Sequence, residues 1–182
     1  MKALIVIDMQ NMYFMEGPYR LSCPEQAAAN AAKVITKFRR EQHPIIHIQH
    51  MFQGRASQEE LMYLREFHEL VKPIKGEIII PKNYPSAFLG TGLQEKLQEL
   101  QADELVIIGM MTHMCIDTTV RAAQDYHYPV TVIADACTTK DLEWKGHKLP
   151  ADVVHNSIMA SLAGRFADVY DVTEYLQSPL DK

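Results

Sequence analysis

Short apolar runs alternate along the chain with longer stretches in which apolar residues recur at helical spacing. The run Ala3–Ile7 is apolar throughout, which is typical of a strand buried on both faces of a parallel sheet. A short strand and a helical turn are predicted within Asp168–Leu176. The other predicted strands are Pro44–Gln49, Glu77–Pro81, Glu104–Gly109 and Pro129–Asp135.

The stretches between these runs are predicted to be helices because their apolar residues fall on one face at a spacing of three or four. Pro24 suits a first helical turn, and Ser57 is a candidate N-cap. The predicted helices are Pro24–Arg40, Ser57–Val71, Thr91–Ala102, Cys115–Tyr128 and Ala151–Ala167.

Strands that alternate with helices imply right-handed βαβ crossovers and an α/β fold. We therefore predict a three-layer α/β/α sandwich with a mainly parallel, Rossmann-like sheet, formed by a single domain over residues 1–182. A chain of this length buries roughly 70% of its unfolded surface, so it needs no disulfide or metal to fold. The least regular stretches, 10–23, 51–57 and 138–149, are the expected loops around a substrate.

Composition narrows the possible functions. The net charge is −5 and no run of lysine or arginine occurs, so we expect no nucleic-acid partner. The first apolar run stops at Asp8, too early for a signal peptide, and no run approaches the roughly 20 residues of a membrane span. Three widely spaced cysteines form neither a disulfide framework nor a metal knuckle, so a cytoplasmic location is expected.

Three chemically useful residues follow predicted strands. Asp8 follows the first strand, Lys82 the third, and Cys115 the fourth. Ligands of open parallel sheets bind at the carboxyl ends of the strands, so a base, a cation and a thiol should meet there. Each has a simpler interpretation: an aspartate that caps a turn, a solvated lysine, and an inert buried cysteine. Their coincidence at one sheet edge favours the chemical interpretation.

Cys115 stands where a strand gives way to a predicted helix, in "GMMTHMCIDTT". The N-terminus of a helix and a nearby lysine favour an anion, and thiols in such settings have pKa values of roughly 3.5–7.5. We therefore expect a thiolate. Backbone N–H groups at the same turn could also stabilise an oxyanion.

Several segments together carry a resemblance to a known family: "IVIDMQ", "KNYPSAF", "GMMTHMCIDTTVRAA", "VTVIADACTT" and "LAGRFADV". In this order, over nearly the whole chain, they resemble the isochorismatase-like cysteine hydrolases, which include nicotinamidases, N-carbamoylsarcosine amidases and isochorismatases. The resemblance implies the isochorismatase-like hydrolase fold, a small-molecule substrate and no cofactor. It also implies a homodimer or larger homo-oligomer.

The resemblance further implies an Asp–Lys–Cys triad at Asp8, Lys82 and Cys115. In this mechanism the thiol attacks an amide carbonyl and forms a thioester, which water then hydrolyses. A cis peptide between Met110 and Met111 is implied, with the backbone N–H groups of Met111 and Cys115 as the oxyanion hole. Because Cys115 is present, an amide or ureido C–N bond is a better expected target than the vinyl ether cleaved by isochorismatases that lack the cysteine.

Two departures from the family pattern bear on the substrate. Met12 and Tyr13 stand where the family has Asp and Phe, although Tyr13 can still form an aromatic wall. The Asp-x-His segment of metal-binding nicotinamidases is replaced by "HIQHMF". His47 and His50 are three apart and should point to opposite faces of a strand, so we expect no metal site.

For the other candidate residues, only the position in the sequence suggests a role. Tyr84, Phe88 and His113 are candidate substrate contacts, with core packing the alternative for Phe88 and a structural role the alternative for His113. Trp144 lies in a polar loop and could form a lid or an interface element. Cys23 and Cys137 are expected to be inert, and Asp135 to order a turn.

An isochorismatase-type vinyl-ether hydrolase remains an alternative to an amidase, and two alternatives from other classes also remain open from sequence. One is a non-catalytic small-molecule-binding protein of the same fold, although all three reactive positions are filled. The other is a thiol redox sensor, for which no resolving cysteine is evident.

Overall fold

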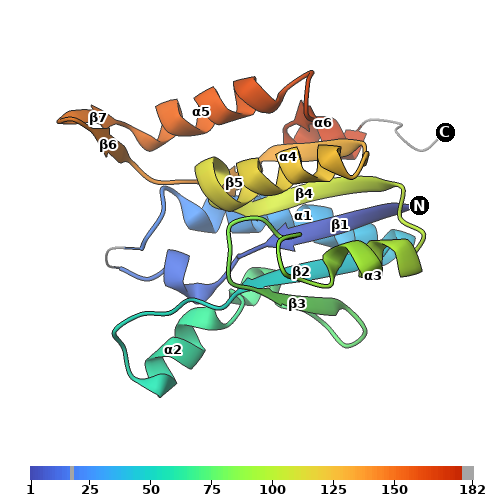
Figure 1. Cartoon of the computed structure of the whole chain (residues 1–182), viewed down its shortest axis with the longest axis horizontal. Helices are drawn as coiled ribbons and strands as arrows, with labels where there is room; N and C mark the ends of the chain where they lie inside the picture. The colour runs from blue at the N-terminus through green and yellow to red at the C-terminus, as the bar shows by residue number, and fades with distance from the viewer. Residues whose placement is uncertain (17–18, 178–182) are drawn as a thin grey trace.

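The computed structural model describes residues 1–16 and 19–177. Six strands form one parallel sheet in the order β3–β2–β1–β4–β5–β8, which confirms the predicted parallel topology (Figure 1). Apolar, β-branched residues fill the central strands because helices cover both faces of the sheet. The strands are β1 (Lys2–Ile7), β2 (Ile45–His50), β3 (Ile78–Lys82), β4 (Glu104–Met110), β5 (Val130–Thr138) and β8 (Asp168–Tyr170).

Helices on the two faces complete the three layers. On one face, α1 (Pro24–Glu41) and α6 (Val172–Gln177) contribute residues to the apolar cluster that contains Leu4 and Val6 of β1. The opposite face is covered by α3 (Leu93–Glu99), α4 (Asp117–Asp125) and α5 (Ala151–Leu162).

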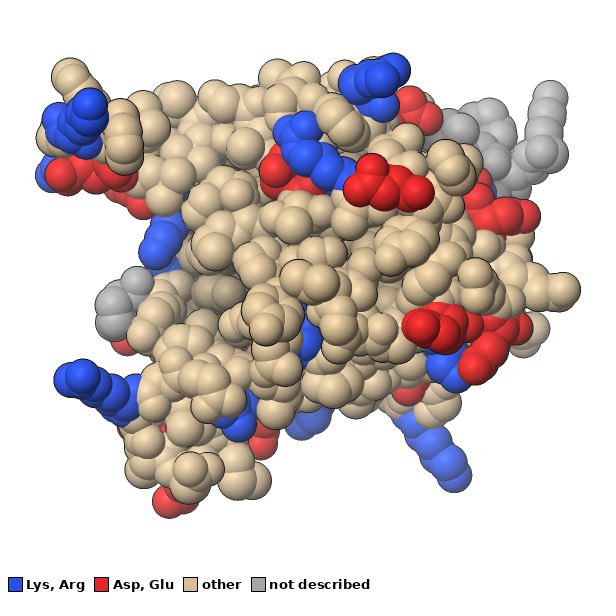
Figure 2. Space-filling model, in the orientation of Figure 1, with Lys and Arg blue, Asp and Glu red and all other residues tan. Residues whose placement is uncertain are grey.

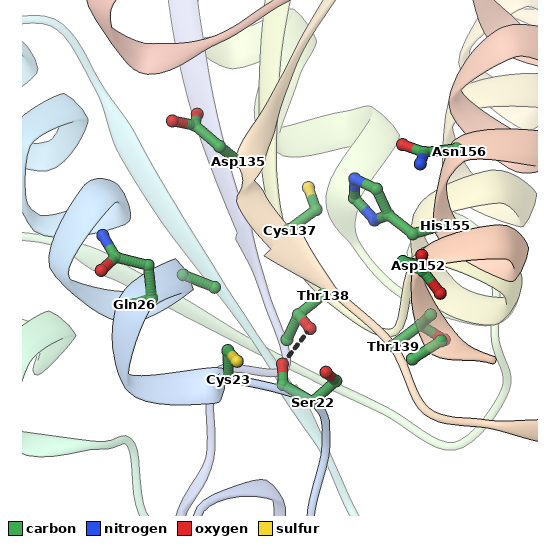
Figure 3. A pocket seen from close by; sticks show the side chains of 12 residues that line it. Ser22, Cys23, Gln26, Asp135, Cys137, Thr138, Thr139, Asp152, His155 and Asn156 are labelled. Carbon is green, nitrogen blue, oxygen red and sulfur yellow. Dashed lines mark hydrogen bonds between the residues drawn. The ribbon is translucent and has the colours of Figure 1, made fainter.

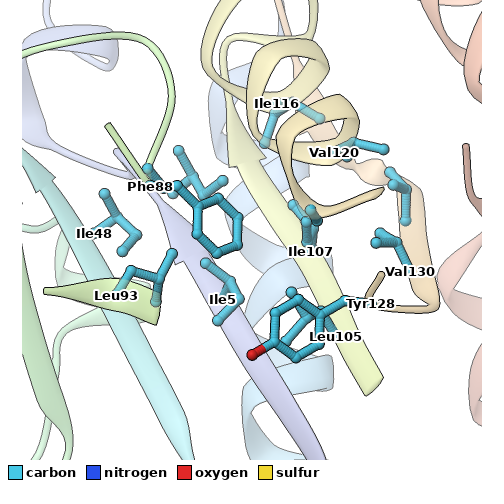
Figure 4. Close-up of a cluster of buried hydrophobic side chains, with 14 of the residues drawn as sticks. Ile5, Ile48, Phe88, Leu93, Leu105, Ile107, Ile116, Val120, Tyr128 and Val130 are labelled. Carbon is cyan, nitrogen blue, oxygen red and sulfur yellow. The ribbon is translucent and has the colours of Figure 1, made fainter. Parts of the chain in front are cut away.

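The core therefore consists of two apolar clusters, one on each side of the sheet. Figure 4 shows part of one cluster, in which Ile5 and Ile107 from neighbouring strands face Leu93 and Val120 from the covering helices. Alternate residues of β1 enter opposite clusters, since successive side chains of a strand point to opposite faces. The parallel strands are thus held in register by burial on both sides.

Of the predicted helices, the one that begins near Ser57 departs most from the sequence expectation. The helix expected over Ser57–Val71 stops at Arg65, as α2 (Gln58–Arg65), and the chain continues through a one-turn η2 (Glu69–Val71). Phe67 between them forms a β-bridge with Gln10, a tertiary contact that outweighs helical propensity. The proposed cap is confirmed, because the Ser57 side chain accepts a hydrogen bond from the Glu60 N–H at 3.1 Å.

The region 138–149, expected to be irregular, contains an antiparallel hairpin of β6 (Leu142–Trp144) and β7 (His147–Leu149). This hairpin projects away from the sheet (Figure 1). Its two-residue turn, Lys145–Gly146, has positive φ at both positions, 50° and 80°, as a tight hairpin with right-handed twist requires.

On the face seen in Figure 2, charged side chains of both signs are scattered around the periphery, and the centre is largely uncharged. Across residues 1–16 and 19–177, no helix is both long and apolar enough to cross a membrane.

Candidate active site

Four neighbouring strands end at the same edge of the sheet, and each contributes one residue to a polar cluster. Asp8 follows β1, His50 ends β2 and Lys82 ends β3. Cys115 lies after β4 in η3 (Thr112–Ile116), a π-helical turn that leads into α4. The parallel register pairs His50 with Lys82, so the two residues stand side by side on adjacent strands.

The structure brings together the three residues that the sequence placed at one edge. Lys82 Nζ is 2.7 Å from Asp8 Oδ2 and 3.3 Å from Cys115 Sγ. The exposed fractions are 0% for Asp8, 1% for Lys82 and 5% for Cys115. The cluster is therefore shielded from water, where ionic interactions are stronger than at a surface.

The protonation state of Cys115 differs from the sequence expectation of a thiolate. Burial, with a further contribution from the Asp8 carboxylate, raises the pKa of the Cys115 thiol to about 12 despite the opposing effect of Lys82. The expectation was wrong because it counted the helix terminus and the lysine but not the cost of burying an anion beside a carboxylate. At neutral pH the resting group is a thiol.

Asp8 is the carboxyl group beside this thiol. Burial raises the pKa of the Asp8 carboxyl above the ordinary value, and the charge and hydrogen bond of Lys82 partly offset this rise. The backbone of Asp8 lies in the left-handed region, with φ of 51°, immediately after β1. Aspartate tolerates this conformation better than most residues, and such outliers cluster at functional sites.

The expected aromatic wall and the turn residues also lie at the cluster. Tyr13, in η1 (Asn11–Tyr13), is buried, and the charges of Asp8 and Cys115 add to burial in raising the pKa of its phenol. Met111 is buried, and the peptide bond between Met110 and Met111 is cis, as the resemblance implies.

The remaining predicted contacts separate into surface and structural positions. Tyr84 is 55% exposed, on the loop that follows Lys82. His113 is half-buried, and its Nδ1 contacts Thr139 Oγ1. Burial, followed by the charge of Lys140, lowers the pKa of His113, so its imidazole is neutral.

Phe88 is buried in the apolar core rather than in the polar cluster. Its ring stacks on Tyr126, with 4.9 Å between ring centroids, and also faces Tyr128 at 6.5 Å. Figure 4 shows the ring among aliphatic side chains that include Ile5 and Leu93. This position favours the core-packing interpretation that the sequence left open.

His47 and His50 contact different groups, as their spacing on a strand predicts. His47 Nε2 lies 2.9 Å from Glu77 Oε2, whereas His50 Nδ1 lies 3.3 Å from Lys82 Nζ. His50 is therefore a member of the cluster that sequence reasoning did not assign. Its position at the end of β2 was the available signal. Among the described residues, no group of three or more His, Cys, Asp or Glu side chains is arranged to hold a metal ion.

A cavity of about 260 Å³ lies elsewhere, between β5 and the N-termini of α1 and α5 (Figure 3). Cys23 and Cys137 line it, and burial raises the pKa of the Cys137 thiol to about 12, as it does for Cys115, so the inert role expected for Cys23 and Cys137 stays a prediction. Asp135, another lining residue, does not end β5 as expected, because the strand continues to Thr138. Its carboxylate instead accepts hydrogen bonds from Asn30 Nδ2 and the Val172 N–H.

Comparisons with known proteins agree with this architecture. Residues 2–173 match the isochorismatase domain family. The uncharacterized isochorismatase family protein YddQ of Bacillus subtilis (strain 168) is 42% identical over 177 residues, which cover 96% of this chain and 98% of YddQ. An isochorismatase crystal structure from Pseudomonas putida KT2440 has a TM-score of 0.90 at 38% identity, over 95% of this chain and 89% of that one.

A more distant relative carries a named activity. Nicotinamidase 3 of Arabidopsis thaliana is 27% identical over 192 residues, which cover 98% of this chain and 88% of that protein. The family match over almost the whole length, together with the fold, leads to one conclusion: the chain belongs to the isochorismatase family of hydrolases.

Proposed function

We propose that the protein is a cysteine hydrolase that cleaves an amide or ureido C–N bond of a small molecule through a thioester intermediate. The observation that carries this proposal is the contact of one buried ammonium, Lys82 Nζ, with both the Asp8 carboxylate and the Cys115 sulfur. A base, a cation and a thiol in a dry site are the groups that nucleophilic acyl transfer requires.

The first half-reaction starts from the neutral thiol. Asp8 accepts the thiol proton as Cys115 Sγ attacks the carbonyl carbon, so that the thiolate forms only when substrate is present. The N–H groups of Met111 and Cys115 stabilise the oxyanion of the tetrahedral intermediate. Asp8 then donates the proton to the leaving nitrogen as the C–N bond breaks, which leaves a thioester on Cys115.

The second half-reaction regenerates the protein. Asp8, ionised again, accepts a proton from a water molecule whose oxygen attacks the thioester carbonyl. The collapse of this second intermediate breaks the C–S bond, releases the carboxylic acid and returns the proton to Cys115. Lys82 remains the counterion of Asp8 throughout, which keeps the carboxylate able to act as a base despite its burial.

The surroundings of the cluster favour a small and partly apolar acyl group. Tyr13 and Met111 are buried beside it, and Met114 is partly exposed on η3. Cys115 is only 5% exposed, which leaves little room for a large substrate. The nicotinamidase among the relatives supports an amide, although no identical substrate is implied by the match.

The decisive experiment combines trapping with substitution. After incubation with small amides or aldehydes, intact-mass spectrometry and peptide mapping should find the adduct on Cys115. Cys115→Ala should abolish turnover and adduct formation with the fold unchanged by circular dichroism.

Cys23→Ala is the matched control, because Cys23 is an exposed cysteine outside the Asp8–Lys82–Cys115 cluster, and it should behave as wild type. Adducts on Cys23 or Cys137 with Cys115 unmodified would contradict the proposal. A lack of turnover across a broad amide panel, with no adduct on Cys115, would favour the non-catalytic binding protein.

A further inference from the structure

We propose that His50 is a positioning residue that holds the Lys82 ammonium between the base and the thiol of the proposed hydrolase. This inference rests on the proposed function for its catalytic consequence, but its geometric basis is independent of any substrate. The β2–β3 register pairs His50 with Lys82, and the side chains meet at 3.3 Å.

The hydrogen-bonding capacity of lysine explains why a third partner is needed. An ammonium group has three N–H donors and no acceptor. Lys82 Nζ has one contact with Asp8 Oδ2 at 2.7 Å, one with Cys115 Sγ at 3.3 Å and one with His50 Nδ1 at 3.3 Å. His50 therefore adds a hydrogen-bond acceptor to a side chain that is only 1% exposed, beside the Cys115 sulfur and the ion-pair partner Asp8. A buried N–H donor of Lys82 without an acceptor would cost free energy, and the ammonium would then favour a different position.

This contact also assigns the tautomer of the imidazole. Because the ammonium can only donate, Nδ1 of His50 must accept, and the ring proton is on Nε2. Burial, followed by the charges of Lys82 and Arg65, lowers the pKa of His50 to about 4, so the ring is neutral and able to accept at physiological pH. These are the two cations that act on it from β3 and α2.

The backbone of His50 is itself held in place. Gln10, which is buried, accepts from the His50 N–H at 2.7 Å and donates to the His50 carbonyl oxygen at 3.0 Å. The same Gln10 amide donates to the Arg65 carbonyl at 2.8 Å. The imidazole is thus presented from a fixed backbone, as a residue that positions another must be.

The test compares side chains that keep or remove the acceptor. His50→Asn keeps an oxygen close to the place of Nδ1, whereas His50→Leu removes the acceptor at similar volume. His50→Gln reaches beyond to the place of Nε2. His147→Gln is the matched control, because His147 is exposed on the projecting hairpin.

Two measurements on the full-length protein are compared across pH. The first is the rate of Cys115 alkylation by iodoacetamide, followed by intact mass and peptide mapping, which requires no substrate. The second is kcat and KM on whichever amide the wild type hydrolyses. Alkylation of wild-type Cys115 without any turnover would count against the proposed function while leaving the His50 test intact.

We expect His50→Leu to slow alkylation at neutral pH about tenfold, the effect of losing one hydrogen bond to a charged group. The acidic limb of the pH profile of His50→Leu should move to higher pH, because a displaced Lys82 lowers the pKa of Asp8 less effectively. The fall in activity should be in kcat rather than KM. His50→Asn should restore the rate and the position of the limb, and His147→Gln should match wild type.

Two results would overturn the inference. One is a folded His50→Leu protein with wild-type alkylation rate and pH profile. The other is a folded His50→Asn protein that is as slow as His50→Leu. If His50→Leu fails to fold, the test is the comparison of the alkylation rates of His50→Asn and His50→Gln, since only asparagine places an acceptor near the position of Nδ1. Equal rates for these two variants would reject the role of Nδ1.

Discussion

At the scale of single residues, burial and the charge of Lys82 act in opposite directions on the pKa values of the site. Burial raises the pKa of both Asp8 and Cys115, and Lys82 opposes both effects. The result is a neutral thiol beside a paired carboxylate, not a free thiolate. Such a thiol is a poor target for adventitious oxidation, since the thiolate is the reactive form. Its activation would then depend on a substrate within reach of Asp8.

The first prediction concerns Asp8 as the proposed general base. We expect Asp8→Asn to lower kcat/KM by about 10²–10⁴, the usual contribution of a general base. Asp125→Asn, an exposed carboxylate at the end of α4, should leave it unchanged. Steady-state kinetics of both variants with any accepted amide provide the measurement, and near-wild-type activity of Asp8→Asn would refute the assignment.

The second prediction concerns pH. The base must be ionised to act, so kcat/KM should fall as pH decreases through the pKa of Asp8. Because burial raises this pKa above 3.8, the acidic limb should lie higher than for an ordinary aspartate. With the Cys115 pKa at about 12, no increase should accompany free-thiol ionisation near pH 8.5. A pH–rate profile with an inflection near 8.5 would show that a thiolate forms without Asp8.

At the scale of elements, β4 approaches β1 closely just before the turn that carries Cys115. Gly109 pairs with Ile7 and has φ of 131°, a conformation that side chains rarely adopt. A Cβ built there would lie 2.0 Å from the Ile7 carbonyl oxygen, which is backbone and cannot move aside. The glycine thus permits both the irregular register of β4 with β5 and the turn that follows.

The third prediction follows from this contact. Gly109→Ala should destabilise the protein by about 3 kcal/mol or more, since strain at a special backbone position adds to the clash. Gly92→Ala is the control because φ there is −88° and no atom lies within 4 Å of the added Cβ. It should cost less than about 1 kcal/mol. Chemical denaturation of both variants measures the difference, and equal stabilities would contradict the structure at β4.

At the scale of the whole molecule, apolar side chains are left exposed around the projecting hairpin. Trp144 is 68% exposed, and Leu149 and Val153 are also exposed nearby in sequence. An isolated two-stranded hairpin is only marginally stable in water. Exposed apolar groups on such an element are typical of an interaction surface.

The fourth prediction is that the protein forms a homodimer or larger homo-oligomer, as the family resemblance implies. Light scattering coupled to size-exclusion chromatography should give an integral multiple of the 20.8 kDa chain mass, at least twofold. A concentration-independent mass of one chain would contradict this expectation. Trp144→Ala, measured in the same way, would show whether the hairpin contributes to the assembly.

Much of the architecture was predictable because it depends on periodic burial. The apolar runs located β1 to β5. Their alternation with amphipathic stretches predicted βαβ crossovers and therefore a parallel sheet. The early end of α2 at Arg65 and the hairpin β6–β7 were missed. The first depends on a bridge between Phe67 and Gln10, and the second is a short exposed ribbon with little apolar patterning.

The sequence by itself determined that Asp8, Lys82 and Cys115 would stand at the carboxyl ends of parallel strands, because strand direction follows from βαβ connectivity. Only the tertiary structure decided how they interact: the 2.7 Å ion pair, the inclusion of His50 and the neutral thiol. The physical reason is that the local sequence pattern specifies which side chains lie at the carboxyl edge of the sheet. Distances, burial and therefore pKa values depend on register and packing between distant segments.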